Sequence, residues 1–296
     1  MEVDKIELDI EKIEESLESV ENVDLKNILN IYKQRIDQIF GSIVLPIAIM
    51  NHGFKGAKYM QYWLEGAIST KNVGKEKTEK GKKEIEEFIR QKQKENSSFD
   101  DSVKELKALR KDIPFIDDAI KNNGLNILVN TWTAFEASVK DAWKIVLNKY
   151  PKKFIFNVTK NQDLSELDGF NSKNISIGLL AKYDFNISNH LGDLIVSKFD
   201  FTGINGIEKS LESLLKLKKE ELKFLKNDSL NQLEIIRHLI VHNAGVIDAD
   251  YLKKSKRENE VLNEKLKLTS NEISKMCNES IYATVATIEL IESKIK

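Results

Sequence analysis

The strongest constraint on this chain is the spacing of its apolar side chains, which recur at steps of three and four residues over much of its length. Such spacing lines one face of an α-helix, and it differs from the strict alternation of a half-buried strand. It runs over residues 6–20, resumes from Leu25 to Ile39, and returns over residues 125–146. Only 13 glycines and 3 prolines occur in 296 residues, which opposes a turn-rich β fold. The sequence therefore predicts an all-α protein, built as a helical bundle.

The bulkiest part of the predicted core lies in residues 115–151. Trp132, Phe135 and Trp143 fall on its apolar face, and we expect one or two buried helices that end at Pro151. The next segment, "KKFIFNV", predicts a short strand that is too isolated to build a sheet. Further helices are expected at 175–183, 189–199 and from 207 onward, so that helices dominate to the end of the chain.

The composition changes from mostly charged and polar residues to apolar and aromatic ones near residue 110. This change predicts two regions, an N-terminal helical region over residues 1–110 and a helical domain over residues 111–296. Capping-box patterns at Ser102–Glu105 and Thr269–Glu272 each predict the start of a helix. The charged run at residues 71–96 is typical of a solvated helix or loop. A basic strip for RNA is the alternative there, and its glutamates oppose it. The N-terminal region is expected to serve dimerisation, sensing or target recognition.

The charge balance and the single cysteine limit the functional classes. With 46 basic and 47 acidic residues, the net charge is −1, so nucleic-acid binding requires a local patch. Cys277 alone cannot form an internal disulfide, which fits a reducing, cytoplasmic compartment. The longest apolar stretch, residues 39–50, is too short to span a bilayer and contains Pro46. We expect a buried core segment or a helix–helix corner there, and no membrane partner.

The segment "IIRHLIVHNAGVID", residues 235–248, places Arg237, His238 and His242 in an apolar run. An unpaired buried charge is costly, so these side chains indicate either a buried polar network or a cleft. A metal-dependent hydrolase is one alternative, because His238 and His242 are four residues apart. However, the zinc motif HExxH requires a glutamate where Leu239 stands. A third ligand would have to come from His190, His52 or a carboxylate, and we expect no metal and no other cofactor.

Acid–base chemistry on a phosphodiester remains. "GINGIEKS" lacks the Gly-Lys-Ser/Thr ending of a phosphate-binding loop, and no serine sits at a strand–turn–helix elbow. A histidine titrates near pH 6.5 and can move protons, while an arginine can hold a phosphate. RNA suits this pair because its own 2′-OH supplies the nucleophile, which leaves 2′,3′-cyclic phosphate and 5′-OH ends.

These residues resemble the signature of the HEPN superfamily, found in bacterial toxins and antiviral defence proteins. The signature is an arginine, then a polar residue such as His238, and a final histidine after four to six residues, here Arg237 to His242. The resemblance covers roughly residues 115–295. It implies that Arg237 clamps the phosphate, that His242 is the main acid–base group and that His238 assists. Asn243 would cap the helix or support the motif by a hydrogen bond, and Glu136, in "TAFEASVKD", would hold Arg237 in place.

The resemblance also implies partners. Arg237 and His242 are five residues apart, about 140° around a helix, so one chain does not present them on one face. A homodimer with a composite active site would gather two such motifs around one RNA phosphate. An antitoxin or another defence-system protein is a further expected partner. The alternative function is a non-catalytic helical module that binds RNA or a partner protein.

Overall fold

The computed structural model describes residues 6–69, 79–95, 116–159 and 177–296. Over these ranges the protein is all-α, as predicted: they contain helices and no strand, and their only bridge is an isolated one between Val246 and Lys265. The same ranges contain no helix with the length and apolar character needed to cross a bilayer.

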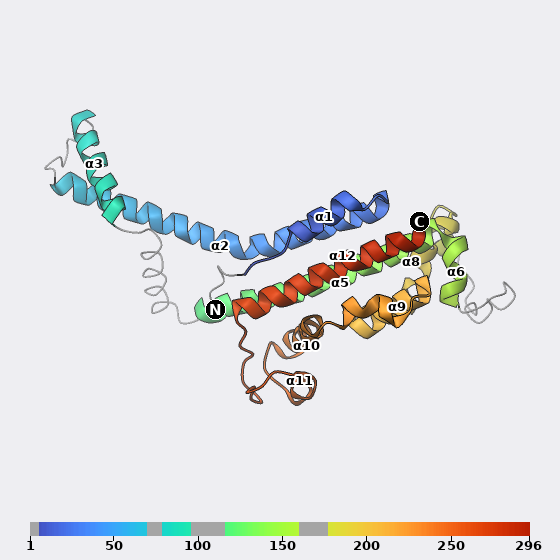
Figure 1. The fold of residues 1–296 in the computed structure, drawn as a ribbon. Coiled ribbons are helices and arrows are strands. Elements are labelled where there is room, and N and C mark those ends of the chain that lie inside the picture. Colours follow the sequence, from blue (N-terminus) through green and yellow to red (C-terminus); the bar gives the residue numbers. More distant parts are fainter. Residues whose placement is uncertain (1–5, 70–78, 96–115, 160–176) are drawn as a thin grey trace. The chain divides into compact units, whose positions relative to one another are not determined.

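Figure 1 shows the helices in their order along the chain. The α-helices are α1 Glu11–Ser19, α2 Val23–Ser69, α3 Glu79–Glu95, α5 Ile116–Lys149, α6 Pro151–Thr159, α7 Ile177–Lys182, α8 Leu191–Ile195, α9 Ile204–Leu215, α10 Asp228–Asn243, α11 Ala249–Lys254 and α12 Ser270–Ile295. Three short 3₁₀ segments lie between them: η3 Ile187–Asn189, η4 Val196–Lys198 and η5 Lys219–Lys226.

The chain divides into two compact units. One comprises Met1–Ile39 and Gly124–Lys296, and the other comprises Phe40–Asn123. The boundary predicted near residue 110 and the capping pattern at Ser102–Glu105 lie outside the described residues. The division into 1–110 and 111–296 therefore stays a prediction, and it differs from the grouping of the first 39 residues with the C-terminal part of the chain.

Helices α5 and α12 form the axis of the larger unit and run alongside each other (Figure 1). Trp132, Phe135 and Trp143 of α5 are fully buried, as their spacing predicts. The indole Nε1 of Trp143 donates a hydrogen bond to the carbonyl oxygen of Ser210, at 3.0 Å, and so ties α5 to α9. Burial of such large side chains contributes most of the driving force for this packing.

The predicted capping box starts α12. The Thr269 hydroxyl accepts a hydrogen bond from the Glu272 N–H at 3.2 Å, and the Glu272 carboxylate accepts one from the Thr269 N–H at 2.7 Å. The apolar side chains that recur at steps of three and four residues along this helix are buried: Ile273, Cys277, Ile281, Val285, Ile288 and Ile291.

Two sequence-based expectations are wrong. "KKFIFNV" is helical rather than a strand, because Pro151 suits the first position of α6 and Phe154 and Val158, four residues apart, are both buried. Of the two alternatives for residues 39–50, the helix–helix corner is wrong, since α2 continues through Pro46, while the burial of side chains 43–50 lies outside the described residues.

The smaller unit holds the second part of α2 and helix α3. Its small apolar cluster joins Tyr62 to Ile85 and Ile89, with the partly buried Trp63 packed against it. The charged run at 71–96 thus contains a helix with one apolar side, and its other described positions are mostly exposed.

Candidate functional site

Helix α10 carries the Arg–His segment, and its ends follow from local chemistry. The Asn227 side chain accepts a hydrogen bond from the Ser229 N–H at 2.7 Å and caps the first turn. The buried side of the helix, which helps to hold it on α12, comprises Ser229, Leu230, Leu233, Ile236 and Leu239. This packing leaves the two histidines of the segment at the surface and Arg237 half-buried.

Arg237 pairs with Glu136 of α5. Its Nη2 lies 3.7 Å from Glu136 Oε2, and the two side chains are only 24% and 16% exposed. Arg237 Nε and Glu136 Oε1 are both buried, and no described residue completes their hydrogen bonding. The structure thus brings together two residues that the sequence analysis singled out, and the arginine keeps donor capacity beyond this ion pair.

Two carboxyls beside Arg237 are unusually hard to ionise. Burial raises the pKa of Glu136 and of Glu234 above the ordinary value for glutamate. The nearby carboxylate of Asp200 raises both pKa values further, whereas the charge of Arg237 acts in the opposite direction. The burial of both carboxyls means that water is partly removed from the surroundings of Arg237.

The two histidines of the segment are exposed, so they do not form the buried network that the apolar run left open. Their rings lie against each other, with centroids 4.3 Å apart and planes inclined by 43°. Both rings are therefore accessible to a bound substrate. Arg237 is half-buried against α5 while His242 is exposed in the last turn of α10.

Asn243 closes the end of α10. Its Nδ2 donates a hydrogen bond to the Val246 carbonyl oxygen at 2.6 Å, and its own carbonyl accepts one from the Val246 N–H at 2.9 Å. Ala244 and Gly245 between them are left-handed, with φ of 50° and 72°. These hydrogen bonds place Asn243 at the end of the helix, as in the capping alternative.

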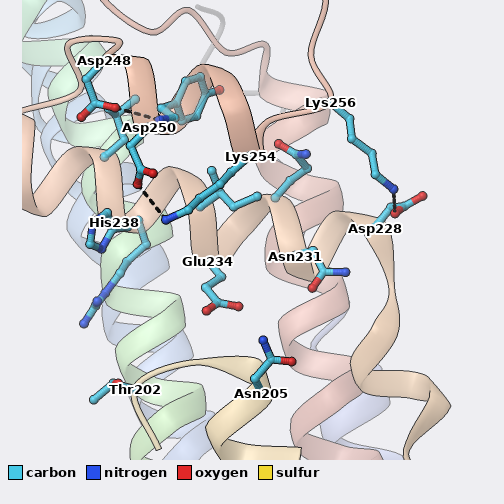
Figure 2. Close-up of a pocket in the computed structure, with 15 residues that line it drawn as sticks. Thr202, Asn205, Asp228, Asn231, Glu234, His238, Asp248, Asp250, Lys254 and Lys256 are labelled. Atoms are coloured by element: carbon cyan, nitrogen blue, oxygen red, sulfur yellow. Dashed lines mark hydrogen bonds and ion pairs between the residues drawn. The ribbon is translucent and has the colours of Figure 1, made fainter.

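A cleft of about 520 Å³ opens beside Arg237 (Figure 2). It lies within the larger unit and is bordered by α10, α11 and the start of α9. Most of its lining is polar: Thr202, Asn205, Asp228, Asn231, Gln232, Glu234, Ile235, Arg237, His238, Leu239, Asp248, Asp250, Tyr251, Lys254 and Lys256. His238 is part of this lining, whereas His242 is not.

Most lining carboxylates already have a protein partner. Asp250 pairs with Lys254, at 2.7 Å between Oδ2 and Nζ, and hydrogen bonding to that lysine lowers the pKa of Asp250. Asp228 pairs with Lys256, also at 2.7 Å (Figure 2). Asp248 caps α11 by accepting a hydrogen bond from the Tyr251 N–H at 2.7 Å.

Glu234 is the exception, and the sequence analysis missed it. Among the described residues it forms no ion pair, and one of its oxygens accepts a weak hydrogen bond from the Ile204 N–H at 3.3 Å. Its spacing three residues before Arg237 could have revealed it, since such residues share a helix face. Asn205, from a distant segment, gave no sequence signal.

The described side chains do not extend the two histidines into a metal site. No cluster of three or more His, Cys, Asp or Glu residues suited to a metal occurs within the described part of the chain. The side chain of His52 lies outside that description, and His190 instead contacts Asp193 at 3.4 Å.

The chain matches no known family model, no curated protein and no solved structure. Its function is therefore argued from the geometry of this segment and the cleft beside it.

Proposed function

We propose that this protein is a metal-independent endoribonuclease of the HEPN type, acting in the cytoplasm as a toxin or antiviral defence effector. The observation that carries the proposal is the placement of Arg237, held by Glu136 beside a polar cleft, next to the exposed pair His238 and His242. These are a phosphate-binding cation and two proton-transfer groups on one helix.

The reaction needs only RNA and these side chains. His242 takes the proton of the 2′-OH, the 2′-oxygen forms a bond to phosphorus, and the bond from phosphorus to the 5′-oxygen breaks. Arg237 stabilises the charge that develops on the phosphorus oxygens. A second, protonated histidine gives its proton to the leaving 5′-oxygen. The products are a 2′,3′-cyclic phosphate and a 5′-OH.

A homodimer brings Arg237 of one chain and His242 of its partner to the same phosphate. Arg237 is turned toward α5 and the cleft, while His242 lies about 140° farther around the helix, so one chain does not present both to one phosphate. Val241, which precedes His242, is 51% exposed, and it offers an apolar contact for a second copy. An antitoxin could bind the same surface and block it.

The test uses purified protein and RNA. We expect cleavage that persists in EDTA, leaves 2′,3′-cyclic phosphate ends, and stops when the RNA is replaced by its 2′-deoxy counterpart. Glu136→Gln should weaken cleavage, and the exposed Glu289→Gln should not. Loss of cleavage in EDTA, or cutting of the 2′-deoxy strand, would rule out the mechanism.

The charge of the cleft favours one alternative, a non-catalytic module that binds a partner protein. Its lining holds four carboxylates (Asp228, Glu234, Asp248 and Asp250) against three cations (Arg237, Lys254 and Lys256). A basic protein segment would suit such a surface. This alternative predicts no cleavage under any condition and unchanged partner binding in His242→Ala.

A further inference from the structure

We propose that the cleft beside Arg237 is a base-reading pocket, in which Glu234 selects guanine. The inference rests on the proposed function, in that Arg237 would hold the phosphate of the nucleotide whose base enters the cleft. It concerns residues other than the Arg–His segment, and it can be tested without any cleavage.

Glu234 lies on the side of α10 that borders the cleft. Asn231, Glu234 and His238 are spaced by three and four residues, so they share the face of α10 that lines the cleft. In Figure 2, Glu234 and Asn205 extend from opposite sides toward the same open space, with Asn231 beside them. A volume of about 520 Å³ is ample for a nucleotide.

The Glu234 carboxylate can accept further hydrogen bonds. A carboxylate has about four acceptor sites, and Glu234 uses one of them for the Ile204 N–H. The carboxylates of Asp228 and Asp250 are engaged by lysines, and that of Asp248 caps a helix. Glu234 is thus the lining carboxylate that has no lysine partner and accepts only a weak hydrogen bond, and its partial burial strengthens any further hydrogen bond it accepts.

The hydrogen-bonding pattern of a carboxylate matches one base, guanine. Guanine alone presents two donors side by side, N1–H and N2–H, which a carboxylate accepts together. Adenine, cytosine and uracil each place an acceptor next to the donor on that edge, which would repel the carboxylate. The amide groups of Asn205 and Asn231 can donate to the remaining acceptors O6 and N7 of guanine.

Gly203 is consistent with this arrangement. A Cβ at this residue would lie 2.6 Å from Glu234 Oε1, so a side chain there would displace the carboxylate. The structural role of Glu234 is to accept the N–H at the start of α9. Glu234→Gln keeps that acceptor and removes the paired one, which separates the two roles.

The experiment is calorimetric titration of the full chain with the four nucleoside 3′-monophosphates, which contain no bond for the enzyme to cleave. We expect guanosine 3′-monophosphate to bind at least about tenfold more tightly than the others. Glu234→Gln should abolish that preference and favour adenine, whose N1 and N6 match an amide. The exposed Glu289→Gln of α12 should retain the preference, and thermal unfolding checks that each variant is folded.

The exposed Asn205→Ala provides a second variant, which should reduce the guanosine preference without affecting folding. Equal affinity for the four nucleotides, no binding of any, or an unchanged preference in Glu234→Gln would each overturn the inference. Guanosine selectivity without RNA cleavage would support the pocket and contradict the proposed function. RNA cleavage without guanosine selectivity would support the proposed function and contradict the pocket.

Discussion

Arg237 of α10 and Glu136 of α5 form a half-buried ion pair between these two helices of the larger unit, with 3.7 Å between Nη2 and Oε2. The pair links a helix that carries the proposed chemistry to the helix with the bulkiest core residues. It sets the direction of the arginine, and it leaves Nε without a described partner. This relationship has consequences for stability that can be measured apart from activity.

We expect Arg237→Gln to lower the free energy of unfolding by about 1–2 kcal/mol, because it leaves the half-buried carboxylate of Glu136 without its partner, and Glu136→Gln to lower it by less, because burial already disfavours the charge that this substitution removes. The double variant should lose less than the sum, with a coupling of about 0.5–1.5 kcal/mol in urea denaturation. The exposed pair Asp250 and Lys254 is the matched control, with an expected coupling below about 0.5 kcal/mol. Equal coupling in both pairs would contradict the account.

The raised pKa values of Glu136 and Glu234 predict a pH dependence of stability. The folded chain holds these two protons to higher pH than the unfolded chain, whose glutamates titrate near about 4.3. Their contribution to stability is therefore fully present below that pH and is lost as the pH rises through the folded pKa values. Glu234→Gln should remove part of this fall, so its stability relative to wild type should increase from about pH 4 to about pH 7. A difference that stays constant with pH would refute the assignment.

Gly192 provides a test of packing near the site's supporting helix. A Cβ there would overlap the backbone of Lys144, with Lys144 Cα only 2.8 Å away. We expect Gly192→Ala to cost about 1–3 kcal/mol of unfolding free energy. Gly178→Ala, in helix α7 with no atom within 4 Å, should be neutral or stabilising by up to about 1 kcal/mol. Similar effects of both substitutions would show that the packing around Gly192 is looser than described.

Cys277 should not react with thiol reagents in the folded protein. It is fully buried on α12, and burial raises its pKa to about 12, so almost no thiolate exists at neutral pH. Its Sγ lies 3.7 Å from the Thr131 hydroxyl. A thiol reagent should therefore react only after urea unfolds the chain. Rapid reaction in native buffer would mean that this part of the core opens readily.

The apolar spacing predicted the helices because a 3.6-residue period needs no tertiary information. It identified the buried tryptophans of α5, and the Thr-x-x-Glu pattern separately identified the start of α12. The apolar spacing failed for α6, where a short run of aromatic and β-branched residues is compatible with either strand or helix. The contact of Phe154 with its surroundings, which sequence spacing does not show, decides between them.

The candidate site was only partly accessible from the sequence. Arg237, His238 and His242 stood out because polar side chains are unusual in an apolar run. The run nevertheless suggested burial, whereas the histidines are exposed, since the buried stripe of α10 is narrow. Glu234 and Asn205 line the same cleft only because the start of α9 approaches α10 at the Ile204 N–H, and a long-range approach of this kind cannot be read from local spacing.

The most direct test of the account is expression of the wild type and His242→Ala in a bacterial host, with growth and RNA ends followed together. His242 is exposed and in none of the hydrogen bonds described, so its replacement should change stability by less than about 0.5 kcal/mol. The account predicts that wild-type expression slows growth and produces fragments with 2′,3′-cyclic phosphate ends, and that the variant does neither. Identical fragments from both proteins, or none from either, would contradict it.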